Sequence, residues 1–254
     1  MKEASMPGGN SLAIIPPAIK TVGRCCRDPL GIVSSFILFL SGLLTALLDF
    51  TAGLFVLPIV LLDLISVISS AGSTKREKAK FGLPFVKFSN IFGIIVLSLI
   101  FATLLLEYFE IITFKQNLLD NIMFELPFPF DMLINSKLLG VEMYLLPLAV
   151  LLLGKLISAC SLSSCVRKNL PKRGVQILAA ILMILSLLGF VWDGLNRMQI
   201  LPSHYKYCGT ELENVITMYT AGAVCFLAAV AVLLLIIKTF RIHTKMRKLK
   251  NAFY

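Results

Sequence analysis

Long apolar runs separated by short polar segments dominate the chain. Six of these runs have about the length that a helix needs to cross the hydrocarbon layer of a membrane, roughly 20 residues. They cover residues 31–48, 54–71, 89–111, 143–163, 175–192 and 216–237. The pattern predicts an all-α polytopic membrane protein with a bundle of six transmembrane helices.

The first two runs are separated only by the sequence LLDFTAGL. A single helix over residues 30–71 would be about 63 Å long, roughly twice the hydrocarbon thickness, so the chain must fold back. Asp49, Thr51 and Gly53 are the turn-favouring residues near the midpoint. We therefore expect a tight hairpin there, with Asp49 in an aqueous turn.

Basic residues gather on one side of this topology. If the amino terminus is cytoplasmic, 19 of the 24 Lys and Arg residues fall in cytoplasmic segments. These are Lys2, Lys20, Arg24, Arg27, Lys75, Arg76, Lys78, Lys80, Lys87, Arg167, Lys168, Lys172, Arg173, Lys238, Arg241, Lys245, Arg247, Lys248 and Lys250. Cytoplasmic loops of membrane proteins are enriched in Lys and Arg, so we expect both termini in the cytoplasm. The net charge of +10 accordingly indicates contact with anionic lipid headgroups and not with nucleic acid.

The opposite side carries acids and aromatic residues. Asp193 begins an outer loop over residues 193–215, and the aromatic residues are expected to form an interfacial belt. They are Tyr108, Tyr144, Trp192, Tyr205, Tyr207 and Tyr219. Residues 112–138 form a second outer loop, expected to rest on the headgroups as an amphipathic helix, or alternatively to act as a lid over a substrate path. No Asn-x-Ser/Thr acceptor occurs in the outer segments, in agreement with a bacterial plasma membrane.

The segment before the first span has helical amphipathic spacing. Its sequence AIKTVGRCCRD places Arg24 and Arg27 on one helical face. Val22 and Cys26 lie on the opposite face, which predicts a short interfacial helix on the inner leaflet, with a solvated linker as the alternative. The chain thus divides into a cytoplasmic N-terminal segment (1–28), a six-span membrane domain (29–238) and a basic cytoplasmic tail (239–254) anchored to anionic lipid.

Two opposite charges lie within the predicted spans at matching depth. Asp63 falls near the middle of the second span and Lys155 near the middle of the fourth. An isolated charge in hydrocarbon costs several kcal/mol, so we expect these side chains to pair, with Ser66 and Ser158 as supporting polar residues one turn away. Such a pair is either a substrate or proton-coupling site or structural glue between helices. The remaining alternative is a protonated Asp63 with Lys155 snorkelling towards the inner interface.

Motifs of enzymes and metal sites are missing from the sequence. The chain lacks the signatures of zinc metalloproteases, serine hydrolases and phosphate-loop nucleotide hydrolases. Cys160 and Cys165 are spaced poorly for zinc and no histidine accompanies them. We predict no catalytic residue, no metal site, no cofactor and no structural disulfide, and we expect that the protein is not an enzyme.

The predicted layout indicates a role in transport. Six spans with both termini inside and an inner interfacial helix resemble the permease subunits of some ATP-driven exporters. The resemblance implies a small non-catalytic permease or membrane subunit, served by a nucleotide-binding partner because this chain has no phosphate loop. A membrane scaffold or accessory protein without transport activity is the alternative, and an intramembrane enzyme is the third.

Overall fold

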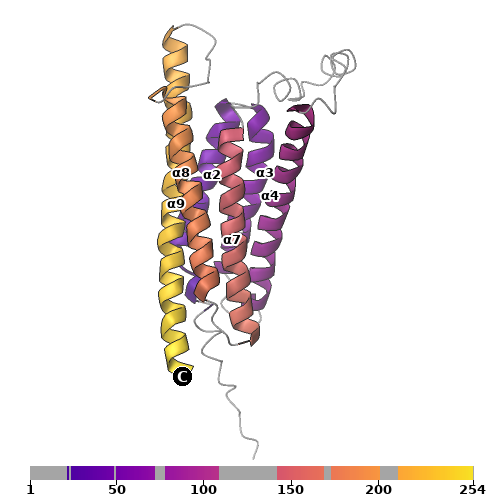
Figure 1. Ribbon diagram of the computed structural model, residues 1–254, viewed down its shortest axis with the longest axis vertical. Helices are drawn as coiled ribbons and strands as arrows, with labels where there is room; N and C mark the ends of the chain where they lie inside the picture. The colour runs from indigo at the N-terminus through magenta and orange to yellow at the C-terminus, as the bar shows by residue number, and fades with distance from the viewer. Residues whose placement is uncertain are drawn as a thin grey trace, which may run out of the picture.

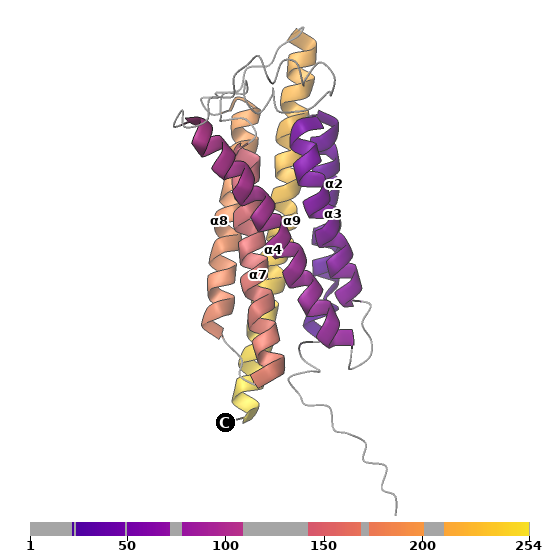
Figure 2. The ribbon, with the colours of Figure 1, turned by 90° about the vertical axis from the view of Figure 1, so that its right-hand side faces the viewer.

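The structure, a computed structural model, describes Val22 and residues 24–48, 50–71, 78–108, 142–168, 173–200 and 211–253. Six long helices account for most of these residues. They are α2 (Pro29–Leu48), α3 (Phe50–Ala71), α4 (Lys78–Tyr108), α7 (Glu142–Lys168), α8 (Arg173–Arg197) and α9 (Glu211–Phe253). The helices run side by side along one long axis, with α4 inclined to the others (Figures 1 and 2). The expected all-α polytopic bundle is confirmed.

Neighbouring helices close into a ring. Each of α2, α3, α4, α7 and α8 packs against the helix described next along the chain, and α9 returns to pack against α2. Helices α7 and α9 also touch each other across the ring. Side chains from α2, α3, α7 and α9 can therefore meet on the axis of the bundle. The end that holds the start of α2 and the end of α9 is named the terminal end; it is the lower end in Figure 1.

The outward face of the ring is apolar. Leu99, Leu188, Trp192 and Ile216 are each more than half exposed. Within the described residues, five apolar stretches are long enough to cross a membrane: Arg24–Leu48, Leu83–Ala102, Tyr144–Cys165, Gly174–Arg197 and Val215–Lys245. Helix α3 contributes the shorter apolar stretch Phe55–Ala71. Helices that are apolar on the outer face of the ring are stable in contact with the hydrocarbon layer of a membrane. The protein is therefore an integral membrane protein.

The predicted fold-back between the first two spans is present, but the turn is shorter than expected, because Thr51 and Gly53 lie within the next helix, α3. Helix α2 ends at Leu48, α3 begins at Phe50, and the two helices pack along each other. Asp49, between them, lies outside the described residues. At its other end α2 starts with Pro29, whose missing amide hydrogen is tolerated in a first turn. Asp28 caps this turn, since its Oδ1 accepts a hydrogen bond from the Leu30 amide over 3.2 Å.

Several helices are longer than the apolar runs that predicted them. Helix α4 begins at Lys78, α8 continues to Arg197, and α9 continues through the basic tail to Phe253. Apolar runs mark only the part of a helix inside hydrocarbon, whereas backbone hydrogen bonding continues into the polar interface. The predicted outer helix within residues 112–138 lies outside the described residues.

The N-terminal segment packs against the bundle. Of this segment the structure describes Val22 and residues 24–28, with a helical turn at Arg24–Cys26. Val22 and Cys25 are buried in one apolar cluster with Leu83, Leu162, Cys165 and Ile242. Of the predicted apolar face, Val22 is therefore buried against the bundle and does not rest on lipid, and Cys26 packs partly buried against the same cluster. Helices α4, α7 and α9 present apolar side chains at the terminal end, and the segment covers them.

Candidate functional site

Asp63 and Lys155 meet on the axis of the bundle. The Lys155 Nζ of α7 contacts both carboxylate oxygens of Asp63 on α3. Asp63 is fully buried and Lys155 is 7% exposed. Removing two charges from water is costly, and only close attraction with further hydrogen bonds offsets that cost.

A serine that the sequence pattern did not single out completes this pair. Ser35 Oγ of α2 donates a hydrogen bond to Asp63 Oδ2 over 2.9 Å. Lys155 Nζ lies 3.5 Å from the same Ser35 oxygen. The three hydrogens of the ammonium group thus face three acceptors, and the network joins α2, α3 and α7. Ser35 could have been found as a polar residue at similar depth in the first span.

Ser66 and Ser158, predicted as supporting polar residues, donate their hydroxyl hydrogens to groups other than the ion pair. Ser66 Oγ donates to the backbone carbonyl oxygen of Asp63 over 2.8 Å, a bond that serines in helices often form with the preceding turn. Ser158 Oγ donates to Gln176 Oε1 of α8 over 3.0 Å. Both serines lie one turn from a member of the pair on its own helix. Their hydroxyl hydrogens are nevertheless used elsewhere.

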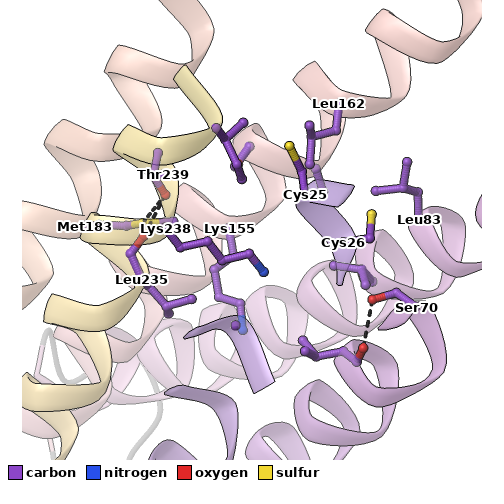
Figure 3. Close-up of a pocket in the computed structure, with 16 residues that line it drawn as sticks. Cys25, Cys26, Ser70, Leu83, Lys155, Leu162, Met183, Leu235, Lys238 and Thr239 are labelled. Atoms are coloured by element: carbon purple, nitrogen blue, oxygen red, sulfur yellow. Dashed lines mark hydrogen bonds between the residues drawn. The ribbon is translucent and has the colours of Figure 1, made fainter. Parts of the chain in front are cut away.

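A cavity of about 70 Å³ adjoins the ion pair on the side of the terminal end. Lys155, Gly31 of α2 and Lys238 of α9 contribute to its wall, together with Cys25 and Cys26 of the N-terminal segment. Figure 3 shows the Lys238 side chain reaching from α9 into the space between Lys155 and the two cysteines. Two ammonium groups, one from α7 and one from α9, therefore face one small volume inside the bundle.

Lys238 lies directly over the first turn of α2. A methyl group added at Gly31 would come within 2.1 Å of Lys238 Nζ, so the missing side chain at Gly31 provides the space for the ammonium group. Within the described residues, none of the ion pairs includes Lys238. Asp28, the acid at the start of α2, lies 3.9 Å from Arg241 Nη1 instead.

Towards the opposite end, a second polar layer crosses the axis. Ser41 Oγ of α2 lies 2.8 Å from the Tyr144 hydroxyl of α7 and donates to the Val224 carbonyl of α9 over 3.1 Å. Tyr144 is 3% exposed and packs edge-on against Phe190 with ring centroids 5.1 Å apart. Its expected place in the interfacial belt is wrong, because its hydroxyl has a partner inside the ring.

Trp192 and Tyr219 are exposed at this end of the bundle, as expected for an interfacial belt.

Between the Tyr144 layer and the ion pair, the axis is filled by apolar side chains. Leu38 of α2 and Leu148, Leu151 and Leu152 of α7 are all buried there. The cavity is thus closed towards the opposite end by a packed apolar layer.

Asp193 is also buried, contrary to the prediction that it begins an outer loop. It lies in α8, where Arg197 Nε, one turn later, is 3.1 Å from each carboxylate oxygen. Cys225 Sγ of α9 donates to Asp193 Oδ2 over 3.2 Å. The pairing with Arg197 at i+4 satisfies the acid within its own helix, so α8 continues past it.

The chain matches no protein-family model, no curated protein and no solved structure. Among the described residues, no three His, Cys, Asp or Glu side chains gather where they could hold a metal ion. In the part of the chain that the structure describes, the buried charged side chains are those of Asp28, Asp63, Lys155 and Asp193. Lys238 contributes to the wall of the cavity beside Lys155.

Proposed function

We propose that the protein is a non-catalytic transport component, a small permease or the membrane subunit of a transport system. The observation that carries this proposal is the convergence of Asp63, Lys155 and Lys238, from three helices, beside one cavity in an apolar ring. Ionisable residues inside a membrane are costly, and they typically mark the paths of substrates or ions.

The arrangement of residues along the axis supports access of a cargo to the ion pair from the terminal end. The cavity adjoins the ion pair at the terminal end, and buried leucines separate the pair from the Ser41–Tyr144 layer. Along α7, the distance from Tyr144 to Lys155 is about 16 Å, a substantial part of the hydrocarbon thickness. A cargo bound at the cavity would reach the other side only after the leucine layer opens.

We infer the orientation from the charges. The basic residues of α9 near the terminal end include Lys238, Arg241 and Lys245, which favours a cytoplasmic terminal end in a bacterial plasma membrane. Because the chain has no phosphate loop, a transport cycle would draw on an ion gradient or on a nucleotide-binding partner.

The second candidate is a membrane scaffold or accessory protein without transport activity. It is favoured by the Ser35–Asp63–Lys155 network, in which every ammonium hydrogen of Lys155 has an acceptor. A network so completely satisfied can serve purely to join three helices.

The test is purification from native membranes in mild detergent, followed by reconstitution into liposomes. We expect a nucleotide-hydrolysing partner to co-purify, or a proton or ion flux under an imposed membrane potential. The flux should be lost in the Asp63→Asn/Lys155→Met double variant, provided that this variant melts like the wild type. Absence of both flux and a nucleotide-hydrolysing partner would reject the transport proposal in favour of the accessory role.

A further inference from the structure

We propose that the cavity binds a phosphate group through Lys238, supplied either by a phospholipid of the leaflet at the terminal end or by free phosphate. This inference deepens the proposed transport function and rests on it for the role of the bound group. Binding itself is measurable without transport, so the two proposals can fail separately.

The charges around the cavity favour an anion. Asp63 and Lys155 neutralise each other, and the carboxylate of Asp28 lies beside Arg241. The Lys238 ammonium therefore brings a positive charge into the cavity that no ion pair within the described residues balances. The Lys155 ammonium already lies within hydrogen-bonding distance of Asp63 and Ser35, which leaves Lys238 as the donor for a ligand.

The position of Lys238 identifies the group that would hold the phosphate. Its Nζ lies over Gly31, in the first turn of α2. The amides of this turn already have acceptors on Asp28, since the Leu30 amide donates to Oδ1 and the Gly31 amide donates to the backbone carbonyl oxygen. A phosphate group would therefore be held by the Lys238 ammonium through a charge-assisted hydrogen bond and not by the helix end.

The size and wall of the cavity fit a phosphate group. A cavity needs about 10–15 Å³ for each water, so about 70 Å³ has room for several waters or for one phosphate. Much of the wall is apolar, with Val67, Leu83 and Ile242 among its residues. Apolar walls favour a phosphate attached to a hydrophobic molecule over a hydrated free ion. Basic pockets between helices near a membrane surface are suited to anionic headgroups.

The test uses the full chain and two probes. Phosphatidylglycerol is titrated against the detergent-solubilised protein and followed by native mass spectrometry, and inorganic phosphate is titrated by calorimetry. We expect Lys238→Met to weaken binding of the effective probe at least about tenfold, because a hydrogen bond to a charged group is lost. Phosphatidylglycerol binding alone identifies the lipid as the source, and competition by inorganic phosphate identifies the free anion.

Further variants serve as matched controls. Gly31→Ala retains the charge but displaces the ammonium group, so it should weaken binding as well, whereas Gly174→Ala, with no atom within 4 Å of the added carbon, should not. Arg247→Gln removes an exposed charge of the same sign at the terminal end and reports on attraction by the surface alone. Lys238→Gln serves if the methionine variant does not fold.

The outcomes separate the two proposals. Binding of neither probe, or equal binding by the wild type and the Lys238 variants, overturns this inference. A loss with Arg247→Gln as large as with Lys238→Met also overturns it, because surface charge would then explain the binding. Binding that depends on Lys238 without any flux would reject the transport proposal alone.

Discussion

Lys155 and Asp63 lie 92 residues apart in the sequence and form an ion pair buried on the axis of the bundle. Removal of either partner leaves the other charge uncompensated in an apolar interior. We expect Asp63→Asn and Lys155→Met each to lower the free energy of unfolding by about 3–5 kcal/mol. The double variant should recover much of this loss in a detergent melting experiment. Two losses that simply add would show that the contact contributes no coupling.

Ser35 should matter more for stability than Ser66, although both are buried serines next to Asp63. Ser35 donates to the carboxylate, and a hydrogen bond to a charged group contributes about 1.5–3 kcal/mol. Ser66 donates to a backbone carbonyl of its own helix, so Ser66→Ala should cost about 0.5 kcal/mol or less. The comparison is made by melting Ser35→Ala and Ser66→Ala under identical conditions. Equal losses would contradict the different roles of the two hydroxyls.

The depth of a residue in the membrane could be predicted from the sequence, because its position within an apolar run gives that depth directly. Asp63 and Lys155 are predicted at the same depth, and two opposite charges at one depth in a small bundle have few other partners. Their pairing was therefore predictable. The rotation of each helix about its axis has no such signal in these uniformly apolar spans. The sequence therefore does not point to Ser35, which faces Asp63 from a third helix. Spacing along the chain favours Ser66 and Ser158 instead, whose hydroxyls donate to other groups.

Two predictions at the ends of the spans are wrong. The sequence predicts Tyr144 and Asp193 at the membrane surface because polar groups usually lie there. Each has a polar partner inside the ring, Ser41 for the tyrosine and Arg197 for the aspartate. For the N-terminal segment, the amphipathic pattern predicts that one face contacts an apolar surface. It does not distinguish the lipid from the end of the bundle, because both surfaces are apolar. The burial of Val22 and Cys25 shows that the bundle is the surface contacted.

Glycines on α8 offer a matched test of the packing between α7 and α8. A methyl group at Gly189 would lie 2.7 Å from Cγ of Pro147, a rigid ring on α7, whereas one at Gly174 meets nothing within 4 Å. Gly189→Ala should therefore destabilise the protein by about 1–3 kcal/mol through overpacking. Gly174→Ala should be neutral or slightly stabilising, because alanine favours helix. Melting temperatures of the two variants check this, and an unchanged Gly189→Ala variant would show that the helices are not so closely packed.

The orientation of the bundle is open to labelling at its two ends. Leu212, at the start of α9, is 70% exposed, and Arg247, near the other end of the same helix, is also exposed. The native Cys25 is a poor reporter, since it is buried whichever side it occupies. In a background in which Cys160 and Cys208 are replaced by serine, Leu212→Cys should react with a membrane-impermeant maleimide on intact cells. Arg247→Cys should react only after the membrane is permeabilised, because basic segments stay in the cytoplasm.

Two other outcomes would contradict this orientation. The reverse order of labelling would show that the topology is inverted. Reaction of both the Leu212→Cys and the Arg247→Cys variants in intact cells would show that α9 does not cross the membrane.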